Sequence, residues 1–168
     1  MSVVAVVLAA GFSTRLGTSK QDIVFEGETL LQRAERLARA AADDLIVVTH
    51  ALNPEAEEGI ASSIRTGVRL VSDDARILIM LCDQPLITIE HLRELVAIDA
   101  PIVATGYAGI AGVPAVFAPE FASELLALRG DRGARAVIEA HRDVTRVVPF
   151  ENAAIDIDTK DDLRKLKG

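Results

Sequence analysis

The chain has 168 residues, of which 50% are hydrophobic and only 4% aromatic, and its formal net charge is −7. This length suffices for one domain with a real core, so we expect residues 1–168 to form a single domain. The negative charge disfavours a general nucleic-acid or anionic-membrane surface, and no apolar run is long enough to span a bilayer. A single cysteine excludes an internal disulfide framework and a multi-cysteine metal site. We therefore expect a cytoplasmic protein.

An apolar run at residues 3–8 predicts a buried strand, and a loop carrying Gly11, Arg15 and Lys20 follows it. Backbone amides beside two fixed cations suit a triphosphate, so the loop predicts a nucleotide site. It matches neither the Walker A pattern nor the dinucleotide fingerprint, and an ordinary strand–helix turn is the alternative. A signal peptide is not expected, because no positive residue precedes the short run.

Apolar blocks alternate with helical patterns along the rest of the chain, without a linker or a repeat. The patterns predict strands at 45–49, 77–82, 102–104, 114–117, 145–148 and 154–157, and helices at 30–41, 60–68, 88–96, 120–128 and 133–142. The uninterrupted run at 77–82 indicates a central strand buried on both faces. This order predicts a doubly wound, Rossmann-like α/β domain, a three-layer sandwich of helices on a mostly parallel sheet.

Asp83 follows the run at 77–82 directly and precedes Gln84 and Pro85. Ligands of such sheets bind beyond the carboxyl ends of the strands, so this carboxylate can share a crevice with the nucleotide loop. There it could hold Mg²⁺, the usual partner of a triphosphate. A turn cap is the alternative for Asp83 taken alone. Beside a triphosphate loop, the metal interpretation is favoured.

Other residues with reactive side chains are expected to be structural. His50, His91 and His141 lie in separate segments without metal-ligand spacing and are predicted to be surface residues. Cys82 ends an apolar strand and is predicted to be a small core residue rather than a nucleophile.

Six motifs follow one another in a fixed order: Leu8–Lys20, Gly59–Gly67, Leu81–Pro85, Gly112–Phe117, Leu128–Arg135 and Asp156–Leu163. Together they resemble the molybdenum cofactor nucleotidylyltransferases, especially the molybdopterin cytidylyltransferase-like branch, nearly from end to end. The resemblance implies a domain of the nucleotide-diphospho-sugar transferase type. It implies Mg²⁺-dependent transfer of CMP from CTP to a molybdopterin-type phosphate acceptor, with release of pyrophosphate, during molybdenum cofactor maturation.

Alternatives remain open at this point. GTP or ATP could replace CTP, and a sugar or polyol phosphate could be the acceptor. A protein of another class, a non-catalytic nucleotide-binding accessory protein for molybdoenzyme assembly, would keep the same fold.

The resemblance also implies roles for individual residues. The implied catalytic residues are Arg15, Lys20 and Asp83. The implied metal ligands are Asp83 and either Asp156 or Asp158, because the spacing places both of these aspartates on the same face of a strand. The implied nucleotide-binding residues are Leu8, Ala9, Ala10, Gly11, Ser13, Arg15, Lys20, Ser63 and Gly67. The implied acceptor-binding residues are Gly112, Pro114, Asp131 and Arg135.

The chain departs from the family pattern between the strand that ends at Thr49 and the segment at 51–54, where a helical segment of that pattern is missing. A βαβ crossover needs at least about 10–12 residues, so we expect one flank of the sheet to be open or remodelled. A second subunit could cover such a flank, which predicts a homodimer. A target molybdoenzyme is the other macromolecular partner expected.

Overall fold

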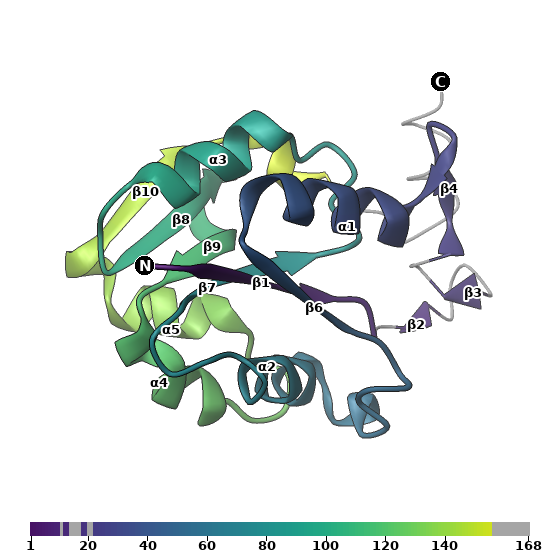
Figure 1. Ribbon diagram of the computed structural model, residues 1–168, viewed down its shortest axis with the longest axis horizontal. Coiled ribbons are helices and arrows are strands. Elements are labelled where there is room, and N and C mark those ends of the chain that lie inside the picture. Colours follow the sequence, from purple (N-terminus) through teal and green to yellow (C-terminus); the bar gives the residue numbers. More distant parts are fainter. Residues whose placement is uncertain (11, 14–17, 20–21, 156–168) are drawn as a thin grey trace.

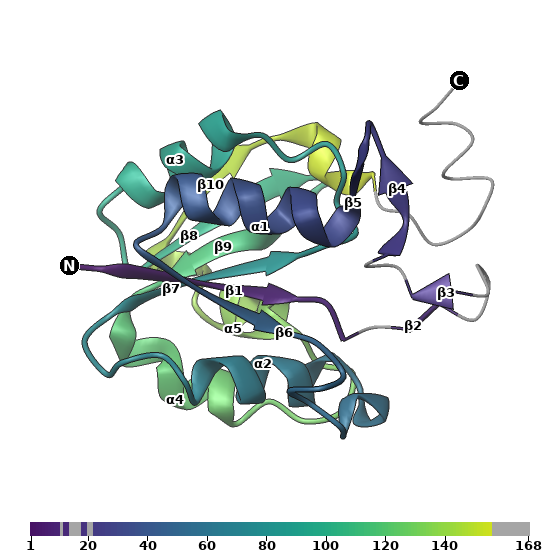
Figure 2. The same ribbon diagram turned by 45° about the vertical axis from the view of Figure 1, so that its right-hand side comes forward.

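The computed structural model describes residues 1–10, 12–13, 18–19 and 22–155, without the side chains of 12–13 and 18–19. Six strands form one sheet in the order β10-β8-β9-β7-β1-β6 (Figures 1 and 2). They are β1 (Val3–Leu8), β6 (Asp44–Val48), β7 (Arg76–Leu81), β8 (Ile102–Tyr107), β9 (Ile110–Phe117) and β10 (Thr145–Pro149). This is the predicted α/β fold with a mostly parallel sheet.

Strand direction decides which residues share an edge of the sheet. β1 pairs in parallel with β6 and β7, and β10 with β8, whereas β9 runs antiparallel to both β7 and β8. The first residues of β9, Gly112 among them, therefore lie at the edge where β1 and β7 end. We call this the carboxyl edge of the sheet.

Helices cover both faces of the sheet (Figure 2). One face carries α1 (Leu30–Ala41) and α3 (Ile89–Ala97), and the other carries α2 (Ile60–Val68), α4 (Ala122–Leu126) and α5 (Ala134–Ala140). β1 contributes to both cores by alternation, because Ala5 and Val7 pack on the α1 side while Val6 and Leu8 pack on the α2 side. This double covering explains why its sequence is continuously apolar.

Short elements complete the described chain. Two hairpins follow β1: β2 (Phe12–Ser13) with β3 (Thr18–Ser19), and β4 (Val24–Phe25) with β5 (Glu28–Thr29). The single-turn helices are η2 (Ala56–Glu58), η3 (Pro119–Phe121), η4 (Arg142–Val144) and η5 (Glu151–Ala154). None of the helices in the described part of the chain is long and apolar enough to cross a membrane.

Helix starts are set by local side-chain bonds. Thr29 and Gln32 form a capping box at α1, with bonds of 2.8 and 3.0 Å between each side chain and the other residue's amide. Thr88 caps α3 by accepting a 3.1 Å bond from the amide of His91, as predicted. α2 begins at Ile60, one residue after Gly59, as its apolar pattern predicts.

The predicted strand at 154–157 is wrong where the structure describes it. Ala154 ends the single turn η5, and the Ile155 amide bonds to the Asn152 carbonyl instead of a neighbouring strand. Because hydrogen bonds within this turn replace pairing with a neighbouring strand, the alternation of apolar and polar residues does not indicate a strand here. Residues 156 and 157 lie outside the described residues.

The flank was predicted to be open or remodelled, and the open form is wrong for the two faces of the sheet beside β6. β6 is an edge strand, but α1 and α2 pack on its two sides, and the chain passes from β6 through a turn and η2 directly into α2. The helix α2 itself supplies the crossover between β6 and β7, so no additional helix is needed. The homodimer, which was predicted from an open flank, loses that argument and stays a prediction.

His91 is buried, with 3% of its surface exposed, which corrects its predicted surface position. Its ring stacks on Phe150 at 4.4 Å, and its Nε2 lies 2.9 Å from Thr105 Oγ1. Thr105 donates its own proton to the Pro114 carbonyl at 2.6 Å, so the imidazole must donate through Nε2–H. The spacing of apolar residues on α3 places His91 on the inner face with Leu92 and Leu95.

Burial lowers the pKa of His91 below 6.5, although Glu94 opposes the shift. His91 therefore binds a proton more readily in the unfolded chain than in the folded chain. The contribution of neutral His91 to the free energy of unfolding should be complete above pH 6.5 and should decrease as the pH falls below that value. We expect His91→Gln to flatten this dependence, because glutamine can donate to Thr105 without titrating. Urea unfolding of the wild-type chain and of His91→Gln at pH 8 and at pH 5 measures this pH dependence. The same dependence in both proteins would show that His91 is not its source.

Candidate active site

β1 ends at the carboxyl edge, where the predicted nucleotide loop begins in the sequence. Leu8, Ala9 and Ala10 are all buried there, and the Ala9 amide donates to the Val48 carbonyl at 2.8 Å. Of the other residues predicted in this loop, Gly11, Arg15 and Lys20 lie outside the described residues. Ser13 is described by its backbone in β2 alone. Those four assignments stay predictions.

Asp83 lies at the same edge, beyond the end of β7. The neighbouring Cys82 amide donates to the Leu8 carbonyl at 3.3 Å, which ties this segment to the end of β1. Asp83 is half-buried, whereas Cys82 is buried among the core residues under α1 and α3, as predicted. The predicted proximity of the end of β1 and the Asp83 segment is therefore built into the sheet.

The side chain of Gln84 also holds the Asp83 segment in place. Its Nε2 donates to the carbonyls of Val113 and Ala153, at 3.1 and 3.0 Å, and its side chain is buried. The Gln84 amide thus joins β7, β9 and η5 next to Asp83. Its Oε1 is buried without a hydrogen-bond partner among the described residues.

The donor chemistry at this edge fits a hard divalent cation. Asp83 offers carboxylate oxygen, while the softer Cys82 and His91 side chains pack on the α1 and α3 face of the sheet. No cluster of three or more His, Cys, Asp or Glu occurs within the described ranges. The two carboxylates predicted to join Asp83, Asp156 and Asp158, lie outside them.

Ser63, the predicted base-side residue, is buried inside the first turn of α2. Asn53 donates through Nδ2 to both Ser62 Oγ and Ser63 Oγ, at 2.9 and 3.0 Å. Ser62 Oγ in turn donates to the carbonyls of Glu55 and Gly59, at 3.1 and 3.0 Å. Asn53 therefore fixes the segment that leads from β6 to α2.

Close packing explains why position 67 is a glycine. A side chain there would meet Val6 and come within 3.0 Å of Val48. The glycine lets α2 lie close against β1 and β6, and this close approach accounts for it without a nucleotide contact.

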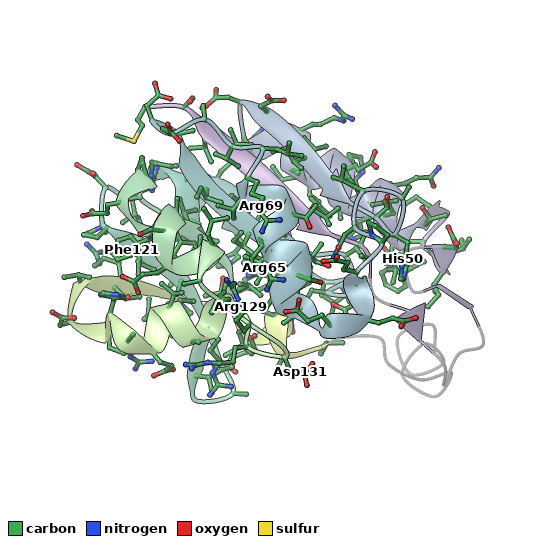
Figure 3. The ribbon with its side chains drawn as sticks, turned by 90° about the horizontal axis from the view of Figure 1, so that it is seen from below. His50, Arg65, Arg69, Phe121, Arg129 and Asp131 are labelled. Atoms are coloured by element: carbon green, nitrogen blue, oxygen red, sulfur yellow. The ribbon has the colours of Figure 1, made fainter. Side chains whose placement is uncertain are left out.

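An ion pair between the buried Arg65 and the exposed Glu58 ties α2 to the loop at residues 128–133, the predicted acceptor loop. Figure 3 labels Arg65 together with Arg129 and Asp131 of this loop. Arg65 pairs with Glu58 at 2.6 Å and also donates to the Leu128 carbonyl at 2.8 Å. Glu58 accepts from the Gly130 amide at 3.0 Å. These bonds from Arg65 and Gly130 lower the pKa of Glu58 to about 2. We call Glu58, Arg65 and Gly130 the Glu58 cluster.

The four predicted acceptor residues do not all converge. Gly112 and Arg135 line one cavity at the carboxyl edge. Asp131 lies on the exposed side of its loop, apart from Arg65 and Arg129 in Figure 3. Pro114 is buried and its carbonyl accepts from Thr105.

The profile of the MobA-like NTP transferase domain matches residues 5–144. The chain belongs to this family. The match spans most of β1, the Asp83 segment and the loop at residues 128–133, so the predicted family resemblance is confirmed. The chain therefore carries a nucleotidyltransferase domain.

Relatives of this MobA-like domain agree over most of its length. The purine catabolism protein PucB of Bacillus subtilis (strain 168) is 27% identical over 165 residues, covering 82% of this chain and 80% of PucB. The crystal structure of Rv0371c from Mycobacterium tuberculosis H37Rv is 30% identical, with a TM-score of 0.86, covering 100% of this chain and 99% of that one. A manganese complex of Rv0371c aligns with a TM-score of 0.79 at 28% identity, covering 99% and 98% of the two chains.

A more distant structure shows the same fold. Molybdopterin-guanine dinucleotide biosynthesis protein A from Archaeoglobus fulgidus has a TM-score of 0.62 at 17% identity, covering 97% of this chain and 96% of that one.

Sequence reasoning missed the residues that brace the MobA-like site: Asn53, Glu58, Arg65 and Gln84. Two of them had a local signal, since Asn53 precedes a proline and Gln84 lies inside the recognised motif. The pairing of Glu58 with Arg65 spans seven residues across a helix start, and its tie to Gly130 joins segments far apart in the chain. Only the folded chain reveals it.

Proposed function

We propose that this MobA-like domain transfers CMP from CTP to the phosphate of a molybdopterin-type acceptor and releases pyrophosphate. The observation that carries the proposal is the placement of Asp83 beside the end of β1, with the Gly112 and Arg135 cavity at the same edge. A nucleotide strand, a carboxylate and an acceptor cavity thus share one edge, where ligands of α/β sheets bind. Family membership supports the reaction type.

Mg²⁺ would be held by Asp83, and by Asp156 or Asp158. When bound, the metal neutralises charge on the phosphate oxygens. Arg15 and Lys20 would bind the triphosphate, and Ser63 would lie toward the base and ribose. The manganese complex of Rv0371c supports a divalent cation in a relative.

The acceptor is the least constrained part of the proposal. PucB is named as a purine catabolism protein, and from it we take the proposal that the product serves a molybdoenzyme of purine breakdown. A non-catalytic accessory protein of the same fold is the alternative in which the nucleotide binds without turnover.

Pyrophosphate release with CTP, GTP or ATP tests the function, each with Mg²⁺ and molybdopterin. We expect release with CTP at least about tenfold faster than with the other two, the discrimination that about 1.4 kcal/mol gives. Equal rates for the three nucleotides would overturn the cytidine assignment. Release only with a polyol phosphate would replace the acceptor, and CTP binding without release for any acceptor would replace the enzyme by an accessory protein.

A further inference from the structure

A small cavity lies on the α1 face of the sheet, between α1 and the end of β7. Its volume is about 10 Å³. Two polar side chains that can form strong hydrogen bonds line it, Arg33 from α1 and Gln84 from the segment after β7. The other walls are largely apolar, with Leu37 and Met80 among them. Because a space of about 10–15 Å³ is enough for one water molecule, the cavity has the size of a single water site.

Both of these side chains have a buried atom without a hydrogen-bond partner among the described residues. On Arg33 this atom is Nε, which can only donate, and on Gln84 it is Oε1, which can only accept. The orientation of the Gln84 amide is fixed, because its Nε2 donates to the carbonyls of Val113 and Ala153. An unpaired buried polar atom is costly, and one water can accept from Nε and donate to Oε1.

The guanidinium of Arg33 also contacts two further segments. Its Nη2 donates to the Ile87 carbonyl at 3.2 Å, downstream of Asp83. Its Nη1 lies 3.7 Å from Oε1 of Glu28 on β5, and the hairpin of β4 and β5 follows the predicted nucleotide loop in the sequence. Only 16% of the Arg33 side chain is exposed. One arginine therefore joins this hairpin to the segment that carries Asp83.

Apolar packing joins the same segments. The Leu30 amide at the start of α1 donates to the Ile23 carbonyl at 2.8 Å. Ile23, Phe25 and Leu30 form a small core against which Leu86 packs. The hairpin, the start of α1 and the Asp83 segment thus pack together, and the guanidinium supplies the polar connections between them.

We propose that Arg33 is a positioning residue for Asp83. An ordered water in the cavity links Arg33 Nε to Gln84 Oε1, and Gln84 holds the segment that carries Asp83. The contacts of Arg33 with Ile87 and Glu28 keep its guanidinium in place. The inference rests on the proposed function, in which Asp83 binds the divalent cation.

A crystal structure of the full chain, at a resolution that shows ordered waters, tests the link directly. We expect one water at about 2.7–3.2 Å from both Arg33 Nε and Gln84 Oε1. A dry cavity, or direct bonds from these two atoms to other protein groups, would overturn the proposal. This measurement depends neither on a variant that folds nor on activity.

Arg33→Lys separates positioning from charge. Lysine keeps the positive charge near Glu28 but has no guanidinium Nε–H to donate in the cavity. Arg36→Lys is the matched control, because Arg36 bonds to Glu28 at 2.6 Å from the same helix and does not line the cavity. Titration with Mn²⁺ alone, followed by electron paramagnetic resonance, should give a dissociation constant about tenfold higher in Arg33→Lys, the lower end for groups that orient metal ligands. Arg36→Lys should bind Mn²⁺ like the wild-type chain.

Wild-type Mn²⁺ affinity in Arg33→Lys, with thermal unfolding intact, would reject the positioning role. Equal weakening by Arg33→Lys and Arg36→Lys would reject it as well, because the ion pairs with Glu28 would then be the cause. Neither measurement needs transfer, so the inference is tested separately from pyrophosphate release. Pyrophosphate release by the wild-type chain with no effect of Arg33→Lys on Mn²⁺ binding would reject the inference alone. The bridging water and the weaker Mn²⁺ binding, without release for any acceptor, would reject the transfer reaction alone.

Discussion

Asp83→Asn should lower the rate of Mg²⁺-dependent pyrophosphate release about 10²–10³-fold, the scale for removing one group that stabilises transition-state charge. Asparagine keeps the shape of the side chain but removes the negative charge that a divalent cation requires. The segment should stay in place, because Gln84 holds it to Val113 and Ala153. Release rates measured over a range of Mg²⁺ concentrations, with thermal unfolding alongside, check this expectation.

Asp73→Asn is the matched control for Asp83. Asp73 is exposed shortly before the other end of β7, away from the carboxyl edge. The control should retain the wild-type rate and metal dependence. Wild-type activity in Asp83→Asn would remove this carboxylate from the proposed mechanism.

Gly59→Ala should have the largest effect outside the metal site. Gly59 has a φ of 130°, a conformation that costs other residues about 1–3 kcal/mol. A Cβ there would also meet the Gly130 carbonyl oxygen and come within 2.5 Å of Asp131 Oδ1. The substitution should therefore push the acceptor loop away from Glu58 and Arg65, which hold it through Gly130 and Leu128. We expect lower stability in urea and a raised KM for the acceptor, with the KM for CTP changed less.

Gly109→Ala separates the effect of backbone strain from the effect of contact with Gly130. Gly109 also has a positive φ, 75°, but nothing lies within 4 Å of the position of its Cβ. This variant should lose stability from the backbone alone and keep the wild-type acceptor KM. Equal acceptor KM values in the two variants would show that contact between Gly59 and Gly130 does not position the loop.

Parts of the fold were predictable because they depend on neighbours in sequence. The apolar run of β7, the cap at Thr88 and the helical spacing of α1 and α2 each carry a local signal, and all were predicted correctly. The strand at 154–157 failed because hydrogen bonds within η5 outweigh an alternating pattern. His91 failed because its partner Thr105 and its stacking partner Phe150 come from other elements.

The candidate site likewise contains residues that could be predicted from the sequence and residues that could not. Asp83 was found from its position after a buried strand, since the end of a strand is visible in sequence. Gln84 and the Glu58–Arg65 pair were not found, because their partners come from distant segments. Val113 is brought to Gln84 by the reversed strand β9, Ala153 by η5, and Gly130 reaches Glu58 by the packing of the 128–133 loop on α2.

By itself, then, the sequence determined the α/β fold, the motif order that marks the family, and the strand ends that carry the nucleotide loop and Asp83. These follow from periodicity and residue chemistry, which are local. Only the tertiary structure decided that α2 closes the flank beside β6, that Glu58 and Arg65 hold the acceptor loop, and that an apolar cavity opens beside Leu8 and Leu81. Those features depend on which surfaces pack together, and packing between distant segments leaves no period in a single sequence.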